Sequence, residues 1–193
     1  MSKQLTKPEL LSLTKGDIPS ASREEKQVGT NCEWFRVNFI KRGKQITYFM
    51  KKSFLKNFSQ VTEDYELLKK TLKNLVPNTV FILWEDWVIF SFSEPIIIEF
   101  DVLEEKNKDF FIQLLQDDEK LVKQLTFFIR KFRELESQGK ILDLYGWENL
   151  VYAKDDKLRY IDNYVVFAQN ETVINASLRK IKYLEDILTI ITQ

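Results

Sequence analysis

The chain has 193 residues, of which 44% are hydrophobic, so it is long enough and apolar enough to bury the core of one domain. Its 29 basic side chains balance 29 acidic ones, and this balance predicts no broad attraction to nucleic acid or to an anionic membrane. Histidine is absent and Cys32 is the single cysteine, which excludes histidine-dependent nucleophilic dyads and triads, histidine-ligated metals and an internal disulfide.

The first 28 residues mix Lys, Ser, Thr, Pro and Glu with few apolar anchors. We interpret residues 1–28 as a loosely held, flexible N-terminal arm. The arm has no continuous apolar core of the kind found in secretory signals, and no part of the chain approaches the roughly 20 apolar residues of a membrane span. We therefore expect a cytoplasmic protein with no membrane association.

A β-hairpin and a helix are expected next. Residues 32–40 and 45–52 are rich in aromatic and β-branched side chains, and Gly43 between them is typical of a hairpin turn. In residues 58–75 apolar side chains recur at spacings of three and four, which predicts an amphipathic helix that ends before Pro77.

Two further strands, at residues 79–85 and 86–92, precede a more helical second half. Residues 96–103 are interpreted as a short apolar connector. A short helix is expected over 109–115, and a stronger amphipathic helix over 121–135.

Gly139 is well placed to end that second helix. A compact hairpin is then predicted from strands at 149–153 and 158–162, and a final amphipathic helix at roughly 173–191. Antiparallel strands grouped first and helices later indicate an α+β fold rather than a doubly wound sheet.

The predicted hairpin and the loop before it carry polar residues that could bind a metal ion. Asn149 and Asp162 are expected opposite each other at its open end, where cross-strand neighbours lie within about 5 Å. An amide oxygen and a carboxylate so placed suit Mg²⁺, and Asp143 in the preceding loop lies within reach of the same space. The alternative is a surface hairpin whose Asn and Asp side chains only form turns and caps.

The order of Asp143, Asn149, a hairpin and Asp162 after an amphipathic helix resembles the catalytic and metal-binding loops of protein kinases and their small-molecule relatives. The upstream order is also similar: a hairpin, a strand ending in YFMKK, a helix with acidic residues, two strands and a connector. The resemblance covers roughly residues 29–168.

The resemblance implies a protein-kinase-like fold in a single domain, residues 29–193. Its N-terminal lobe, residues 29–95, would be an antiparallel sheet. Its C-terminal lobe, residues 96–193, would be minimal and helical and would hold the catalytic-loop hairpin.

Carried over to this sequence, the resemblance implies ATP and Mg²⁺ as cofactors. Asp162 would hold the metal at the phosphates, with Asn149 as its second ligand. Asp143 would orient or deprotonate the acceptor hydroxyl, and either Lys51 or Lys52 would pair with the α- and β-phosphates.

The helix partner of that lysine would be Glu66, with Glu63 and Asp64 as rivals. The alternatives are ordinary: Lys51 and Lys52 as a solvated strand end, and the acidic residues as a solvated helix face supported by nearby lysines.

Departures from the family pattern leave two functions open. Gly29 stands alone where the family has a glycine-rich loop, Ile141 and Leu142 replace the usual His and Arg, and Asn149 follows Asp143 by one residue more than usual. We expect a compact, atypical kinase-like protein that binds ATP and Mg²⁺ and transfers phosphate to a small or unknown acceptor. The alternative is a catalytically inactive kinase-like (pseudokinase) module that binds a protein partner; nucleic acid is not expected to bind.

Overall fold

The computed structural model describes residues 22–28, 33–41, 44–54, 57–84, 88–162 and 164–192. The chain forms two compact units: unit 1 comprises 1–62 and 78–95, and unit 2 comprises 63–77 and 96–193. Cys32, the predicted turn at Gly43 and residues 1–21 of the predicted arm lie outside the described residues.

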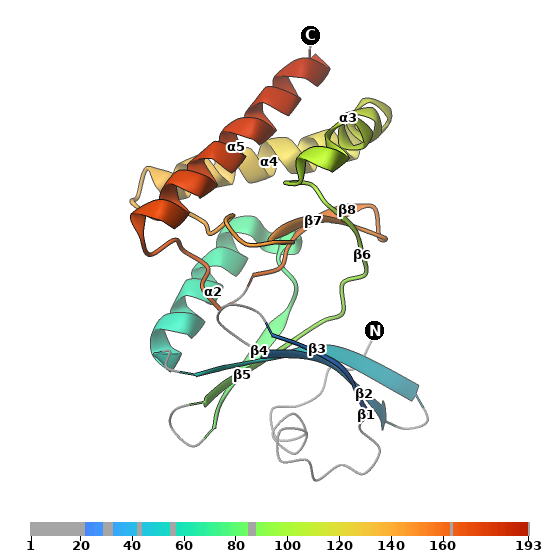
Figure 1. Ribbon diagram of the computed structural model, residues 1–193, viewed down its shortest axis with the longest axis vertical. Coiled ribbons are helices and arrows are strands. Elements are labelled where there is room, and N and C mark those ends of the chain that lie inside the picture. The colour runs from blue at the N-terminus through green and yellow to red at the C-terminus, as the bar shows by residue number, and fades with distance from the viewer. Residues whose placement is uncertain are drawn as a thin grey trace. The chain divides into compact units, whose positions relative to one another are not determined.

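Unit 1 contains a five-stranded sheet in the order β1-β2-β3-β5-β4, in which every neighbouring pair is antiparallel (Figure 1). Its strands are β1 Ser22–Val28, β2 Glu33–Lys41, β3 Lys44–Phe54, β4 Thr79–Trp84 and β5 Val88–Ser93. The strands predicted from sequence between residues 32 and 92 are confirmed. Residues 22–28, expected within the arm, instead pair with β2 as an edge strand, and their polar sequence SREEKQV carries no apolar alternation that would have predicted it.

Buried side chains on the inner strands hold this sheet together. Val37, Met50 and Phe92 are almost fully buried, and all six residues of β5 are buried. Asn38 is also buried, and the Thr47 hydroxyl donates a 2.6 Å hydrogen bond to its Oδ1, which offsets the cost of removing the amide from water.

Helix α2, Phe58–Leu72, continues into a short 3-10 turn, η1 Lys73–Leu75, so the predicted helix over 58–75 is confirmed. Its apolar side is buried, and the Tyr65 hydroxyl donates a 2.9 Å hydrogen bond to the carbonyl of Pro77. This bond ties the helix to the segment that ends it.

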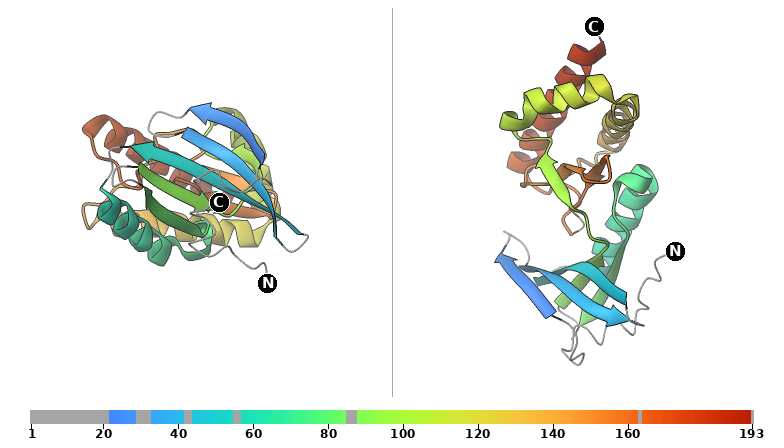
Figure 2. Two further views of the ribbon diagram at one scale, coloured as in Figure 1. Left: turned by 90° about the horizontal axis from the view of Figure 1, so that it is seen from below. Right: turned by 90° about the vertical axis from the view of Figure 1, so that its right-hand side faces the viewer.

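Unit 2 contains three helices among its described residues after α2: α3 Lys108–Asp117, α4 Glu119–Glu136 and α5 Glu171–Thr192 (Figure 2). Asp118 caps α4 by accepting hydrogen bonds from the backbone N–H groups of Lys120 and Leu121, and Gly139 beyond its end has φ +76°, as a helix-terminating glycine requires. No described helix is both long enough and apolar enough to span a membrane.

A three-stranded antiparallel sheet in the order β6-β7-β8 completes unit 2. Its strands are β6 Ile98–Asp101, β7 Leu150–Ala153 and β8 Lys157–Tyr160. The predicted hairpin of β7 and β8 is confirmed. The prediction of a connector over 96–103 is wrong, because part of it pairs with β7. Strand pairing is a long-range property, and the four residues IEFD are too few for their alternation to predict a strand.

The core of unit 2 lies between these helices and the hairpin. The buried side chains of α4 recur every three or four residues, as the sequence predicted: Leu121, Leu125, Phe128, Ile129, Phe132 and Leu135. Phe128 stacks on the fully buried Tyr160 of β8, with ring centroids 6.5 Å apart. This packing fixes the hairpin against α4 and thereby sets the position of the polar residues at its open end.

Candidate functional site

The segment from Asp143 to Asn149, which we call the site loop, leads from the end of α4 into β7. The backbone N–H of Asp143 donates to the carbonyl of Val166 at 2.9 Å, and Leu142 forms an isolated bridge with Phe167. The start of the site loop is therefore fixed to the chain that follows the hairpin.

The side chain of Asn149 joins the two ends of the site loop by a hydrogen bond. It is 8% exposed, and its Nδ2 donates to the backbone carbonyl of Asp143 at 2.9 Å. The Tyr160 hydroxyl donates to the same carbonyl at 3.0 Å. Gly146 leaves room for this arrangement, since a Cβ there would lie 3.0 Å from the amide atoms of Asn149. No described group donates to the Oδ1 of Asn149, so that oxygen retains its lone pairs for a ligand.

Asp162 follows β8, and its Oδ1 accepts a 3.2 Å hydrogen bond from the N–H of Tyr164. The carbonyl of Asn149 accepts from the N–H of Ile161 at 3.0 Å, which extends the hairpin pairing almost to Asp162. Asp143, Asn149 and Asp162 all lie at or beside the open end of the hairpin. The expectation that Asn149 lies opposite Asp162 is wrong by one residue, because Leu150 pairs with Tyr160 and Asn149 therefore lies opposite Ile161.

The Asp143 carboxyl is the electrostatically unusual member of this group. Burial raises its pKa above the ordinary value, and the charge of Asp162 raises it further. The N–H groups of Tyr145 and Gly146 and the charge of Lys180 act in the opposite direction without cancelling the rise in pKa. The ionised form of Asp143 therefore lowers the free energy of unfolding at neutral pH.

We expect Asp143→Asn to increase the free energy of unfolding at pH 7, by less than ~1 kcal/mol because solvent screens a half-exposed group. A raised pKa means that the folded state binds the Asp143 proton more tightly than the unfolded state. The cost is therefore absent below the ordinary pKa of 3.8 and grows as pH rises through the raised pKa. Urea unfolding of both proteins at pH 3 and pH 7 checks this, and a variant that is less stable at pH 7 would contradict it.

Three further residues hold the site loop, and none was identified from sequence. Asp101, at the end of β6, is buried and accepts hydrogen bonds from the backbone N–H groups of Leu103 and Glu148, both at 2.8 Å. Asp101 is one of two acidic residues in the mainly apolar segment 96–103, and nothing local distinguishes it from Glu99.

The other two come from α5. The Oγ of Ser177 accepts from the N–H of Leu144 at 2.9 Å, and the Nζ of Lys180 lies 3.2 Å from the carbonyl oxygen of Gly146. Helical periodicity does not distinguish these two residues from other polar residues of α5.

The lysines predicted to bind the nucleotide phosphates and the glutamate predicted to pair with them belong to different units. Lys51 and Lys52 are half-buried in β3 of unit 1, opposite Ser91 and Phe90 of β5 respectively. Glu66 lies in the part of α2 that belongs to unit 2, and its side chain is exposed. A pairing between either lysine and Glu66 stays a prediction.

The rival acidic residues of α2 differ in their surroundings. Asp64 is partly buried, and its Oδ1 lies 3.9 Å from the Nζ of Lys140, whereas Glu63 is exposed. Asp64 therefore has an ion-pair partner within unit 2.

The donor set at the hairpin suits a hard cation that is shared with a substrate. Among the described residues no group of three or more Asp, Glu or Cys side chains is arranged to hold a metal ion. Asn149 and Asp162 instead offer one amide oxygen and carboxylate oxygens. Mg²⁺ typically takes one or two carboxylates and completes its shell with waters and substrate phosphates, so these residues fit Mg²⁺ bound together with a nucleotide.

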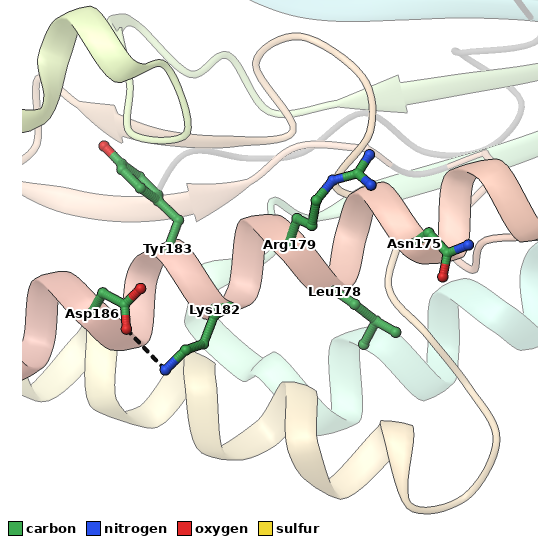
Figure 3. A pocket seen from close by; sticks show the side chains of 6 residues that line it. All are labelled: Asn175, Leu178, Arg179, Lys182, Tyr183 and Asp186. Carbon is green, nitrogen blue, oxygen red and sulfur yellow. Dashed lines mark ion pairs between the residues drawn. The ribbon is translucent and has the colours of Figure 1, made fainter.

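A separate hollow of about 470 Å³ runs along α5 (Figure 3). All of its lining residues come from this one helix: Asn175, Leu178, Arg179, Lys182, Tyr183 and Asp186. The side chains of Lys182 and Asp186 form an ion pair of 2.9 Å there. Because all of its described lining residues come from one helix, this hollow does not show the polar groups converging from several elements that a binding site has.

Comparison with known proteins identifies a similar solved structure but no protein that is similar in sequence. No protein-family model matches the chain, and no curated protein sequence matches it. Among solved structures, the kinase PK-1 of Cydia pomonella granulovirus is similar, with a TM-score of 0.52 and 12% sequence identity. The match covers 82% of this chain and 58% of that one, so this chain spans little more than half of the viral kinase. The likeness supports a kinase-like fold.

Proposed function

We propose that this protein is a compact, atypical kinase-like protein that binds ATP with Mg²⁺ and transfers phosphate to a small acceptor. The observation that carries the proposal is the arrangement of Asn149. Its amide nitrogen is bound to the Asp143 carbonyl, while its amide oxygen has no described donor, at the end of the hairpin near which Asp143 and Asp162 also lie. The kinase-like fold supports this interpretation.

In this proposal Asp162 and Asn149 hold Mg²⁺, which would neutralise charge on the nucleotide phosphates. Asp143 would orient or deprotonate the acceptor hydroxyl, a task suited to a carboxylate whose pKa burial has raised. Either Lys51 or Lys52 would bind the α- and β-phosphates, with Glu66 as its ion-pair partner. Catalysis would then consist of positioning and charge stabilisation, as is general for phosphoryl transfer.

Calorimetric titration with ATP tests the proposal directly. We expect saturable binding with Mg²⁺ present and none with EDTA, because the proposed phosphate contacts depend on the metal. Absence of heat in both titrations, together with absence of ADP production over hours, would refute nucleotide binding and transfer.

A second function, an inactive module that binds another protein, is favoured by one feature of the site loop. Its Trp147 is 85% exposed and its Tyr145 is 56% exposed, although both belong to a loop held by several hydrogen bonds. Large exposed aromatic side chains are enriched at protein interfaces.

If the protein works in this second way, Trp147→Ala should weaken partner binding without changing stability. We expect its free energy of unfolding to stay within about 0.5 kcal/mol of wild type, because an exposed side chain makes few contacts. Affinity for a partner identified by cross-linking, compared with the control Ile190→Ala on α5, checks this; equal affinity in all three proteins would argue against the aromatic pair as an interface.

A further inference from the structure

One face of α5 binds the site loop at two successive points. Ser177 is fully buried, and its hydroxyl oxygen accepts from the N–H of Leu144. Lys180, three residues later, places its Nζ 3.2 Å from the carbonyl oxygen of Gly146 and 3.5 Å from that of Tyr145. Residues three apart on a helix lie on the same face, so the two contacts belong to one docking of α5 against the loop.

The surroundings of Lys180 explain why a lysine is tolerated in this half-buried place. Burial lowers the pKa of its ammonium group, while the negative charges of Asp101, Asp143 and Glu104 favour the charged form. The group therefore has three acidic neighbours around it and two backbone carbonyls in contact with it. An ammonium carries three N–H donors, so both carbonyl contacts can be satisfied at once.

Tyr145 links Lys180 to Asp143. Its carbonyl oxygen lies 3.5 Å from the Nζ of Lys180, and its N–H donates to the Oδ1 of Asp143 at 2.9 Å. The carbonyl oxygen of the next residue, Gly146, lies 3.2 Å from the same Nζ. A cation that holds two successive carbonyls restrains the backbone at Tyr145, and it thereby keeps the Tyr145 N–H directed at the carboxylate.

We propose that Lys180 is a positioning residue of the candidate site, which holds the backbone of Tyr145 and Gly146 and thereby fixes the direction of the Asp143 carboxylate that the Tyr145 N–H contacts. This role rests on the proposed function and extends it, because it adds α5 to a site otherwise built from the hairpin and its flanking loops. Lys180 itself is not assigned a contact with substrate.

Three variants separate this role from general packing. Lys180→Met keeps most of the aliphatic stem and removes the charge, whereas Lys180→Arg keeps the charge and N–H donors. The matched control is Lys182→Met, since Lys182 lies on the same helix but is exposed and pairs with Asp186 (Figure 3).

Amide hydrogen exchange of the full chain is the measurement. In Lys180→Met we expect exchange of the Tyr145 N–H to accelerate about tenfold, the effect of losing one hydrogen bond to a charged group. Exchange in the middle of α4 should not change. Lys180→Arg should restore most of the protection, and Lys182→Met should match wild type. Unchanged exchange in Lys180→Met, acceleration throughout unit 2, or an arginine variant that behaves like the methionine variant would each overturn the proposal.

A kinetic measurement distinguishes a positioning role from a purely structural one, because a purely structural role would not change kcat alone. In a protein that transfers phosphate, Lys180→Met should lower kcat about tenfold with the KM for ATP unchanged, because Asp143 acts on the acceptor and not on the nucleotide. An equal rise in KM would contradict this. The exchange measurement needs no nucleotide, so a wild-type protein that fails to bind ATP refutes the proposed function, while exchange still decides whether Lys180 positions the loop.

Discussion

Saturating ATP with Mg²⁺ is expected to raise the melting temperature of this protein by roughly 5–10 °C. A ligand at about 100 times its dissociation constant adds roughly 2.7 kcal/mol to the free energy of unfolding, and each kcal/mol shifts the melting temperature of a chain this long by about 2–4 °C. The stabilisation should require both components, because the proposed site binds the phosphates through the metal. ATP with EDTA and Mg²⁺ alone should each leave the transition where it is.

Asp162→Asn should remove most of this shift. The substitution keeps the shape of the side chain and an acceptor for the N–H of Tyr164, but it removes the charge that would hold the metal. A hundredfold loss of affinity would leave only about 0.4 kcal/mol of stabilisation at the same ATP concentration.

The matched control for this experiment is Asp186→Asn, which removes an equal charge from the exposed surface of α5. It should retain the full shift. If Asp162→Asn responds to ATP and Mg²⁺ as wild type does, Asp162 is not a metal ligand and the proposed assignment of the hairpin is wrong.

The parts of the fold that the sequence predicted well are those specified by local patterns. Helix α4 has an apolar residue at nearly every third or fourth position and a terminating glycine, and both signals agree with its observed bounds to within about two residues. The β7–β8 hairpin has a short polar turn between apolar strands. In both cases the interactions that define the element lie within a few residues of each other.

The elements that were missed depend on distant partners. Strand β6 is defined by pairing with β7, about fifty residues later, and β1 is a polar edge strand that needs only β2 beside it. The polar sequence of β1 has no apolar alternation, and the alternation in β6 covers only the four residues IEFD, which is too short to predict a strand.

The residues of the candidate site likewise fall into those that local sequence predicts and those that only long-range contacts reveal. Asn149 and Asp162 were predicted because the hairpin between them sets their separation, and Asp143 because it lies in the loop that precedes the hairpin, where the resemblance to protein kinases has an aspartate. The groups that fix the site loop were not, since Asp101 reaches Glu148 across 47 residues and Lys180 reaches Gly146 across 34. Contacts of this kind follow from the packing of α5 and β6, which no local pattern in a single sequence encodes.

Phe128→Ala is expected to be among the most damaging single substitutions in unit 2, with a loss of about 3–5 kcal/mol in the free energy of unfolding. Phe128 has no exposed surface and stacks on Tyr160, so the shortened side chain would leave a cavity between α4 and the hairpin. Surrounding groups fill such cavities only in part, and the loss therefore exceeds the transfer free energy of the ring alone. Urea denaturation followed by circular dichroism measures it.

Two companion variants show what such a loss means for the site. Phe110→Ala truncates a ring that is 52% exposed and should cost much less, so a similar cost for both would contradict the packing described for α4. Tyr160→Phe keeps the stacked ring but removes the hydroxyl that donates to the Asp143 carbonyl, and should cost about 1 kcal/mol. Because Asn149 also binds that carbonyl, the site loop should survive in Tyr160→Phe, with faster exchange confined to its amides. The two kinds of interaction can then be measured separately. The packing of Phe128 against Tyr160 determines whether unit 2 folds, and the hydrogen bonds to the Asp143 carbonyl determine how firmly Asp143 is held.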